Sequence, residues 1–277
     1  MTEVGARTIG DKTLLTVSDG NLHIGPDRLF KNIPAAQSAP LLQPVDDEGN
    51  ALIPMRSLVI RSGGRLILID TGLGLHSPIR REDGTLLAEL AAAGIRPAEI
   101  NDVVISHAHG DHIGWSTVED EHGRHTTFPN ARYWISGPEF RHWMQPAHLE
   151  SNASLRAHLP ALEGSGQLEL PEDEAEIAPG VRLLATPGHT PGHRSVLVTG
   201  GTQVALFTGD LSHHPLHYEF PNWGSVFDSD PDQAYRTRVR MLNQATADHL
   251  LLISYHHPTP YGQAINHGAS FRWEPVD

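Results

Sequence analysis

Three histidines and one aspartate are packed into the six residues from His107 to His112, within the segment Ser106-His-Ala-His-Gly-Asp-His112. The segment follows an apolar run, Asp102-Val-Val-Ile-Ser106, that is typical of a buried strand. Neutral imidazole and carboxylate groups are ligands of divalent ions such as zinc. A solvated histidine-rich loop is the alternative, but donor-type residues recur beside turn glycines further along the chain. We therefore interpret the segment as part of a metal site.

Other donor-type residues also stand where predicted strands end. Together with the first segment they give seven candidate ligands: His107, His109, Asp111, His112, His189, Asp210 and one of His256 or His257. Seven nitrogen and oxygen donors are too many for one tetrahedral zinc, and they suit two ions that share a carboxylate and a water. The sequence therefore predicts a dinuclear hydrolytic site.

The composition disfavours several other classes of protein. A formal net charge of -13 without a basic cluster argues against nucleic acid as a partner. There is no cysteine, so any metal must be held by nitrogen and oxygen. The first twenty residues mix charged residues with short apolar pieces, which predicts neither a signal peptide nor a membrane anchor. We expect a cytoplasmic protein that acts on a small molecule and does not bind a membrane.

Strands and helices that alternate along the chain would position the candidate ligands. Strands are predicted at 14–17, 57–60, 66–69, 102–106, 131–135, 181–185, 195–198, 204–207 and 250–253, and helices at 86–93, 138–145 and 231–247. The first strand is expected to end in a turn at Ser18-Asp-Gly20. Residues 21–50 carry four prolines and predict a long surface excursion rather than a packed element. No linker is evident, so residues 1–277 are expected to form a single domain.

The motifs, taken in order, resemble those of the metallo-β-lactamase superfamily over nearly the whole chain. They are Asp70-Thr-Gly72, Ser106-His-Ala-His-Gly-Asp-His112, Thr186-Pro-Gly-His189, Thr208-Gly-Asp210 and the terminal histidine. The resemblance implies an α/β (α+β) fold, an αβ/βα sandwich of two mixed sheets flanked by helices, with the metals at the edge of the sheets.

The same resemblance divides the ligands between two divalent ions. It places His107, His109 and His189 on the first ion and Asp111, His112 and the terminal histidine on the second, with Asp210 as the bridge. The Pro-rich turn after Tyr255-His-His257 favours His256 as the terminal ligand over His257. Asp70 matches a buried position that orients a ligand. Zinc is the first expectation for both ions, and manganese, cobalt and iron are compatible with the same donors.

Within the superfamily, Pro191-Gly-His193, Gly209–His214 and Phe227–Pro231 resemble the branch of methyl parathion hydrolase and the quorum-quenching lactonases. This branch implies hydrolysis of a lactone, such as an acyl-homoserine lactone, by a metal-bridging hydroxide. It also implies a homodimer. Asp111 and His213 are the predicted catalytic residues. His213 departs from the tyrosine that lactonases close to the Bacillus type carry three residues after the bridging aspartate.

Alternatives to a lactonase are a phosphotriester hydrolase, a thioesterase of the glyoxalase II type, an iron redox protein and a non-catalytic relative. Trp115 follows the metal segment by three residues and is the best candidate for lining the substrate pocket, although core packing is the default for a tryptophan. His193 and His214 are expected to be structural. Asp228 and Asp230 precede Pro231 and are expected to cap the following helix.

Overall fold

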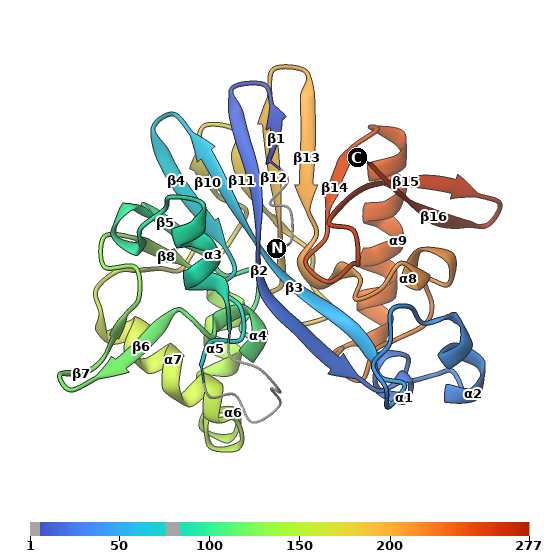
Figure 1. The fold of residues 1–277 in the computed structure, drawn as a ribbon, viewed down its shortest axis with the longest axis horizontal. Helices are drawn as coiled ribbons and strands as arrows, with labels where there is room; N and C mark the ends of the chain where they lie inside the picture. Colours follow the sequence, from blue (N-terminus) through green and yellow to red (C-terminus); the bar gives the residue numbers. More distant parts are fainter. Residues whose placement is uncertain (1–5, 76–83, 277) are drawn as a thin grey trace.

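The computed structural model describes residues 6–75 and 84–276, in which the strands form two large sheets packed against each other (Figure 1). The first sheet has the order β1-β2-β3-β4-β5-β8-β9. Its strands are β1 (Ala6–Ile9), β2 (Lys12–Ile24), β3 (Ala51–Ser62), β4 (Arg65–Ile69), β5 (Asp102–Val104), β8 (Arg132–Trp134) and β9 (Leu168–Glu169). The parallel pairs β4–β5, β5–β8 and β8–β9 make it a mixed sheet.

The second sheet has the order β10-β11-β12-β13-β14-β15-β16, with β13 and β14 parallel and the other pairs antiparallel. Its strands are β10 (Glu176–Ala178), β11 (Val181–Ala185), β12 (Arg194–Gly200), β13 (Gln203–Phe207), β14 (Leu251–Ile253), β15 (Tyr261–His267) and β16 (Ser270–Pro275). A separate hairpin is formed by β6 (Thr117–Asp120) and β7 (Gly123–Thr126).

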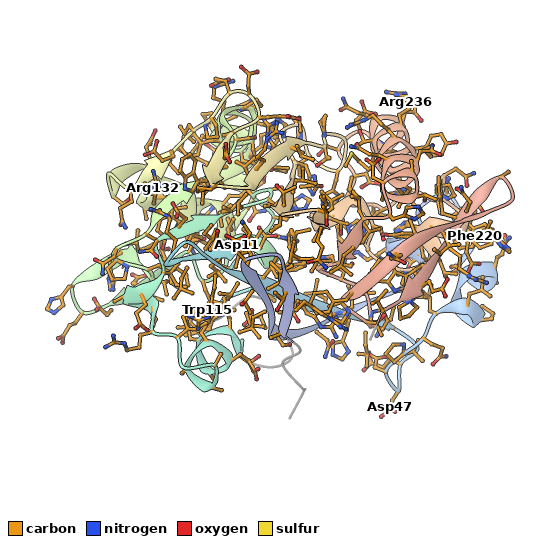
Figure 2. All side chains as sticks on the ribbon, turned by 90° about the horizontal axis from the view of Figure 1, so that it is seen from above. Asp11, Asp47, Trp115, Arg132, Phe220 and Arg236 are labelled. Carbon is orange, nitrogen blue, oxygen red and sulfur yellow. The ribbon has the colours of Figure 1, made fainter. Side chains whose placement is uncertain are left out.

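Helices cover the outer face of each sheet (Figures 1 and 2). The longer ones are α3 (Leu86–Ala92), α5 (Gly137–Trp143), α6 (Pro146–Ser151), α7 (Ala153–Gly164) and α9 (Pro231–Ala247). Single turns are α1 (Pro26–Leu29), α2 (Ala35–Ser38), α4 (Gly110–Ile113), α8 (Leu216–Glu219) and the 3-10 turns η1 (Ala39–Leu41), η2 (Pro97–Glu99) and η3 (Gly209–Leu211). Within residues 6–75 and 84–276, no helix has the length and apolar character needed to cross a membrane.

Alternating side chains on the strands form the layers of the core. On β3, Leu58 and Ile60 point into the cluster between the sheets, whereas Val59 points into the cluster beneath the helices. The second sheet behaves in the same way, because Phe207 faces the first sheet and Leu206 packs with residues of α9. Successive side chains of a strand point to opposite faces, so apolar strands of this kind are buried on both sides. The predicted αβ/βα sandwich is therefore confirmed.

The interpretation of residues 21–50 as an excursion without packed elements was wrong in part. Strand β2 continues through the expected turn to Ile24, with only an irregularity in register between Ser18 and Asn21. Leu22, Ile24, Leu29, Phe30 and Leu42 are buried in the cluster between the sheets. Gly20 adopts a φ of 94°, a conformation that glycine allows without a break in the strand. Pro26 begins α1, Pro34 precedes α2 and Pro40 lies within η1, so three of the four prolines belong to or precede single helical turns of a segment that returns to the core.

The ends of the central strands place the candidate ligands on one edge of the sandwich. Parallel β4 and β5 lead into Asp70 and His107, and parallel β13 and β14 lead into Asp210 and His256. The carboxyl ends of parallel strands meet at the same edge, which is where α/β proteins bind their ligands. Because the two sheets pack face to face, loops from both halves meet at this edge.

Candidate metal centre

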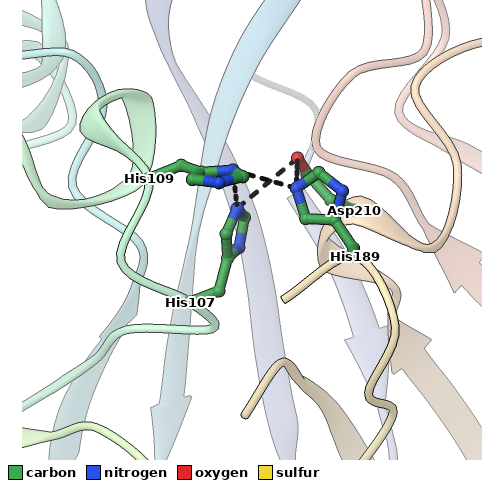
Figure 3. A group of neighbouring side chains, drawn as sticks. All are labelled: His107, His109, His189 and Asp210. Atoms are coloured by element: carbon green, nitrogen blue, oxygen red, sulfur yellow. Dashed lines mark hydrogen bonds and ion pairs between the residues drawn. The ribbon is translucent and has the colours of Figure 1, made fainter. Parts of the chain in front are cut away.

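Two groups of donor atoms lie next to each other at this edge. His107, His109, His189 and Asp210 form one group, in which one donor atom of each residue lies within 4.8 Å of the others (Figure 3). Asp111, His112 and His256 form the second group by the same measure. All seven candidate ligands predicted from the sequence are therefore brought together, although they come from four separate loops.

Asp210 stands between the two groups. Its Oδ2 lies 3.2 Å from His189 Nε2 and 3.6 Å from His107 Nε2. Its Oδ1 lies 3.3 Å from both His112 Nε2 and His256 Nε2. Each carboxylate oxygen thus faces a different group of imidazoles, which is the arrangement expected of a carboxylate shared by two ions.

The donors suit divalent cations. His112 Nε2 and Asp210 Oδ1 are buried and make no hydrogen bond in the described structure. A buried polar atom without a partner destabilises the fold, so a bound metal ion would be a natural partner for both atoms. Burial, reinforced by neighbouring imidazoles, lowers the pKa of His107 and His109 well below 6.5. Burial also acts on His112 and His189, but Asp210 and other nearby carboxylates outweigh it and raise the pKa of His112 well above 6.5 and the pKa of His189 to about 9. These two imidazoles therefore release a proton when they bind a metal. Burial tends to raise the pKa of Asp210, but the surrounding histidines outweigh it and lower the pKa well below 3.8. Neutral imidazole and ionised carboxylate are the forms that bind metal.

Hydrogen bonds on the far side of the rings fix their orientation. Asp70 is fully buried, and its Oδ2 lies 2.8 Å from His112 Nδ1 and accepts from Ser106 Oγ at 2.7 Å. Asp70 adopts a φ of 60°, an uncommon left-handed conformation that its bonds to Ser106 hold in place. His256 Nδ1 lies 2.8 Å from Pro54 O on β3. Such bonds leave the opposite nitrogen to face a metal.

Asp228 has a different place from the one expected. Asp230 caps α9 by accepting from Gln233 N at 2.9 Å, as predicted. Asp228 instead lies with its Oδ1 2.9 Å from His189 Nδ1, and its Oδ2 accepts from Ser225 N. It therefore orients His189 as Asp70 orients His112. Its distance of 39 residues from His189 along the chain explains why the sequence pattern did not indicate this pairing.

The structure distinguishes between the two adjacent histidines near the end of the chain. His256 Nε2 lies 3.5 Å from Asp111 Oδ2 and faces Asp210. His257 points the other way, where Nε2 bonds to Ser212 Oγ and its ring packs edge-on against Trp273. His256, the residue favoured in the sequence, is thus the one placed among the donors.

Glu139 links the two histidine loops and was missed in the sequence. Its side chain is fully buried, and its Oε1 accepts from Ala108 N at 2.9 Å and Trp143 Nε1 at 2.7 Å. Its Oε2 accepts from Thr190 Oγ1 and Gly192 N, both at 2.8 Å. One carboxylate therefore connects the loop that holds His107 and His109 to the loop that holds His189. A single glutamate in the first turn of a helix gives no sequence signal for such a role.

His193 is buried beside the donors but does not belong to either group. Its Nδ1 lies 2.8 Å from Thr186 Oγ1, and its Nε2 accepts from the backbone N–H of Asp210 at 2.9 Å. The structural role predicted for His193 thus includes holding the loop of Asp210. His214 also lies outside the groups, with its Nδ1 accepting from Leu216 N.

A cavity of about 210 Å³ opens above the donors and is called the site cavity below. Its lining residues are His109, Gly110, Asp111, Asp210, His213 and His256 on one side and Leu22, His23, Ile24, Arg28, Leu29, Ile53 and Phe227 on the other. His213 is buried, and its Nε2 lies 3.2 Å from Asp210 Oδ2. A cavity with a polar floor and an apolar wall suits a small amphipathic ligand.

Trp115 does not line the site cavity. Its indole is buried in the cluster beneath α3 and α7, and Nε1 donates to Asp19 Oδ1 at 2.9 Å. It borders a separate hollow with Leu73, Thr117 and Ala157. Three residues after the metal segment, the short α4 has already turned the chain back into the core, so proximity in sequence was a poor guide. The apolar wall comes instead from the end of β2, α1 and β3.

Comparison with known proteins agrees with this geometry. Residues 56–257 match the model of the Metallo-beta-lactamase superfamily. An N-acyl homoserine lactonase of Bacillus cereus is 27% identical over 201 residues, which are 66% of this chain and 74% of that protein. AidC, a dizinc quorum-quenching lactonase solved with the product N-hexanoyl-L-homoserine, aligns with a TM-score of 0.88 and 24% identity over 99% of this chain and 97% of its own. The hydrolase AbOPH aligns with a TM-score of 0.86 and 24% identity over the same shares.

The chain belongs to the metallo-beta-lactamase superfamily. Within it, the chain is a metal-dependent hydrolase, since the donor groups of such a centre are complete and its relatives include lactonases.

Proposed function

We propose that this protein hydrolyses lactones, with N-acyl homoserine lactones as the substrate class, and that the two ions are zinc. The observation that carries the proposal is the position of Asp210, whose two oxygens face two separate donor groups at the floor of a cavity with an apolar wall. The lactonases among the relatives, including the dizinc AidC, support the choice of substrate class and metal.

The donor residues would hold two metal ions in the proposed reaction. Two divalent ions at the donor groups, when bound, supply activation of water and polarisation of the ester carbonyl. His107, His109 and His189 would hold one ion, and Asp111, His112 and His256 the other. Asp210 would be shared.

Asp111 and His213 are the proposed catalytic residues, because both line the site cavity next to Asp210. The Asp111 side chain is 15% exposed, whereas the Asp210 side chain is only 2% exposed. Asp111 is therefore the carboxylate better placed to take up a proton from the reaction, and His213 would hydrogen-bond the substrate ester.

The proposal is tested by the rate of hydrolysis of a lactone panel by zinc-loaded protein and by its His109→Ala variant. We expect the variant to lose at least about a hundredfold in kcat/KM, because one ion would keep only two imidazoles and the shared carboxylate. His122→Ala is a matched control, since that histidine is exposed on the β6–β7 turn and should leave the rate unchanged.

Equal rates for the wild type and His109→Ala would contradict the proposal. The same panel contains a phosphotriester and a thioester of glutathione. Faster turnover of either compound than of every lactone would assign a different hydrolase activity to the same centre.

A further inference from the structure

The wall of the site cavity opposite the donors carries a cation that the reaction described above does not use. Leu22, Ile24, Leu29 and Ile53 make this wall apolar, and Arg28 stands among them. Its guanidinium carbon lies 5.2 Å from the centre of the Phe227 ring, which lines the cavity as well. Arg28 is exposed to solvent, and within residues 6–75 and 84–276 its side chain makes no hydrogen bond or ion pair.

The backbone that carries Arg28 and Phe227 is fixed by hydrogen bonds between α1 and the loop at 222–228. Val226 N donates to Arg28 O at 3.2 Å, and Lys31 N donates to Gly224 O at 2.7 Å. Asn32 exchanges two bonds of 2.9 Å with this loop, one with Asn222 O and one with Gly224 N. The position from which Arg28 reaches the cavity is therefore set by both halves of the chain.

Contact with an aromatic face leaves the hydrogen-bonding edge of a guanidinium available. The N–H groups of arginine lie in the plane of the guanidinium, so a stacked arginine still donates sideways. No carboxylate lines the apolar side of the site cavity. On that side of the cavity, the exposed Arg28 guanidinium therefore donates to water or to a ligand.

We propose that Arg28 determines specificity by donating to a carbonyl oxygen of the substrate that lies outside the lactone ring. This inference rests on the proposed function and adds the residue by which the cavity recognises the amide of an acyl-homoserine lactone. A neutral amide oxygen can accept from the guanidinium while the rest of the substituent contacts the apolar wall, so that no second charge is placed against Leu22 and Leu29. The acyl chain beyond the amide would then contact Leu22, Leu29 and Phe227.

The test compares a lactone with an amide substituent, N-hexanoyl homoserine lactone, with one that has an alkyl chain and no amide, γ-decalactone. In Arg28→Met we expect KM for the N-hexanoyl compound to rise about tenfold, the usual effect of losing one hydrogen bond to a charged group, with kcat within about twofold. KM for γ-decalactone should not change, and Arg28→Lys should restore part of the affinity. The control is Arg236→Met, an exposed arginine on the outer side of α9 (Figure 2).

A second measurement does not depend on turnover. The affinity of the zinc-loaded protein for the γ-lactam analogue of N-hexanoyl homoserine lactone, which keeps the amide and has no carboxylate, should fall by a similar factor in Arg28→Met and remain unchanged in Arg236→Met when it is measured by calorimetry. An equal rise in KM for both lactones would mean that Arg28 only shapes the wall, and unchanged values for both would mean that it does not contact the substrate. Either result overturns the inference while the proposed function stands. If the wild type hydrolyses neither lactone, the proposed function itself fails.

Discussion

At the scale of single residues, the contacts of His213 are those of a residue that takes part in the site, because its ring lies among the candidate metal ligands and not in an apolar cluster. It is buried beside Asp210, stacks on His256 with the rings 5.6 Å apart, and makes no hydrogen bond through Nδ1 in the described structure. Burial lowers its pKa, although Asp210 opposes this effect. A neutral imidazole therefore lines the cavity near neutral pH.

Replacing His213 with phenylalanine should lower kcat by about a hundredfold, the usual loss when one group that stabilises the transition state is removed. KM should change much less. His213→Gln retains a hydrogen-bonding group and should recover part of the rate. The measurement is steady-state kinetics on the best lactone of the panel, together with zinc content, which should remain at two equivalents. A kcat within twofold of the wild type in His213→Phe would remove His213 from the catalytic residues.

At the scale of secondary-structure elements, the first turn of α5 braces the two histidine loops. Ser136 caps the helix by accepting from Glu139 N at 3.2 Å, and its hydroxyl donates to Gly192 O at 2.7 Å. A side chain at Gly192 would collide with this turn, because its Cβ would lie 2.3 Å from Glu139 N. Close contact of this kind lets Glu139 reach both loops. Trp143, one turn later, packs edge-on against the ring of His109.

Glu139→Gln should weaken metal binding at the group of His107, His109 and His189. The amide retains one acceptor oxygen and turns its NH₂ toward two donors, so two of the four hydrogen bonds are lost. We expect a 10- to 100-fold loss of affinity for one of two zinc ions, about the effect of altering other groups that orient ligands.

The measurement is zinc retention during titration with a chelator. Glu172→Gln is the control, because that exposed carboxylate pairs with exposed Arg141 on the surface. Retention of both ions at wild-type affinity in Glu139→Gln would show that metal binding does not depend on the hydrogen bonds from Glu139 to the two histidine loops.

At the scale of the whole molecule, the candidate metal centre depends on contact between the two halves. Arg56 on β3 is largely buried, and its guanidinium donates to the carbonyls of His257 and Pro258, next to the contact of His256 Nδ1 with Pro54 O. The first sheet thus holds a loop that follows the second sheet. Unfolding of either half would remove ligands from both groups.

Because buried histidines outside the donor groups resist protonation in the folded state, we expect the stability of the fold to fall in acid. Burial lowers the pKa of His158 and of His214 from 6.5 to about 4. A group whose pKa is lower in the folded state stabilises the fold above pH 6.5, and this contribution is lost as the pH falls from 6.5 to about 4. For each histidine the difference corresponds to on the order of 3 kcal/mol of unfolding free energy.

The Tm of the metal-free protein should therefore fall between pH 6.5 and 4. In His158→Gln, which can keep a hydrogen bond to Thr117 but cannot titrate, the fall should be smaller. Exposed His122→Gln should retain the wild-type dependence. Thermal unfolding across this pH range provides the measurement, and identical slopes in His158→Gln and the wild type would contradict the assignment.

The donor-type residues and most of the strands that lead into them were predicted from local sequence, whereas the fold class followed from the resemblance of the ordered motifs to a family. Helices α6 and α7 and strands β15 and β16 were not predicted. Helix 231–247 was predicted with the bounds that the structure has, since Asp230 and Pro231 mark its start and apolar residues repeat along one face. The donors of the 107–112 segment were equally clear, because they directly follow a strand that ends at the edge of the sheet. The sequence by itself thus determined which residue types meet at the candidate metal centre.

Only the tertiary structure decided how those residues are held and what lies opposite them. The pairing of Asp228 with His189, the brace at Glu139, the direction of His256 against that of His257 and the absence of Trp115 from the site cavity all depend on contacts between distant segments. Most of the wall around Arg28 comes from the segment 21–50, which was predicted to be a surface loop because it contains four prolines. Side-chain direction and long-range packing are properties of the folded chain, and no local pattern of residue types encodes them.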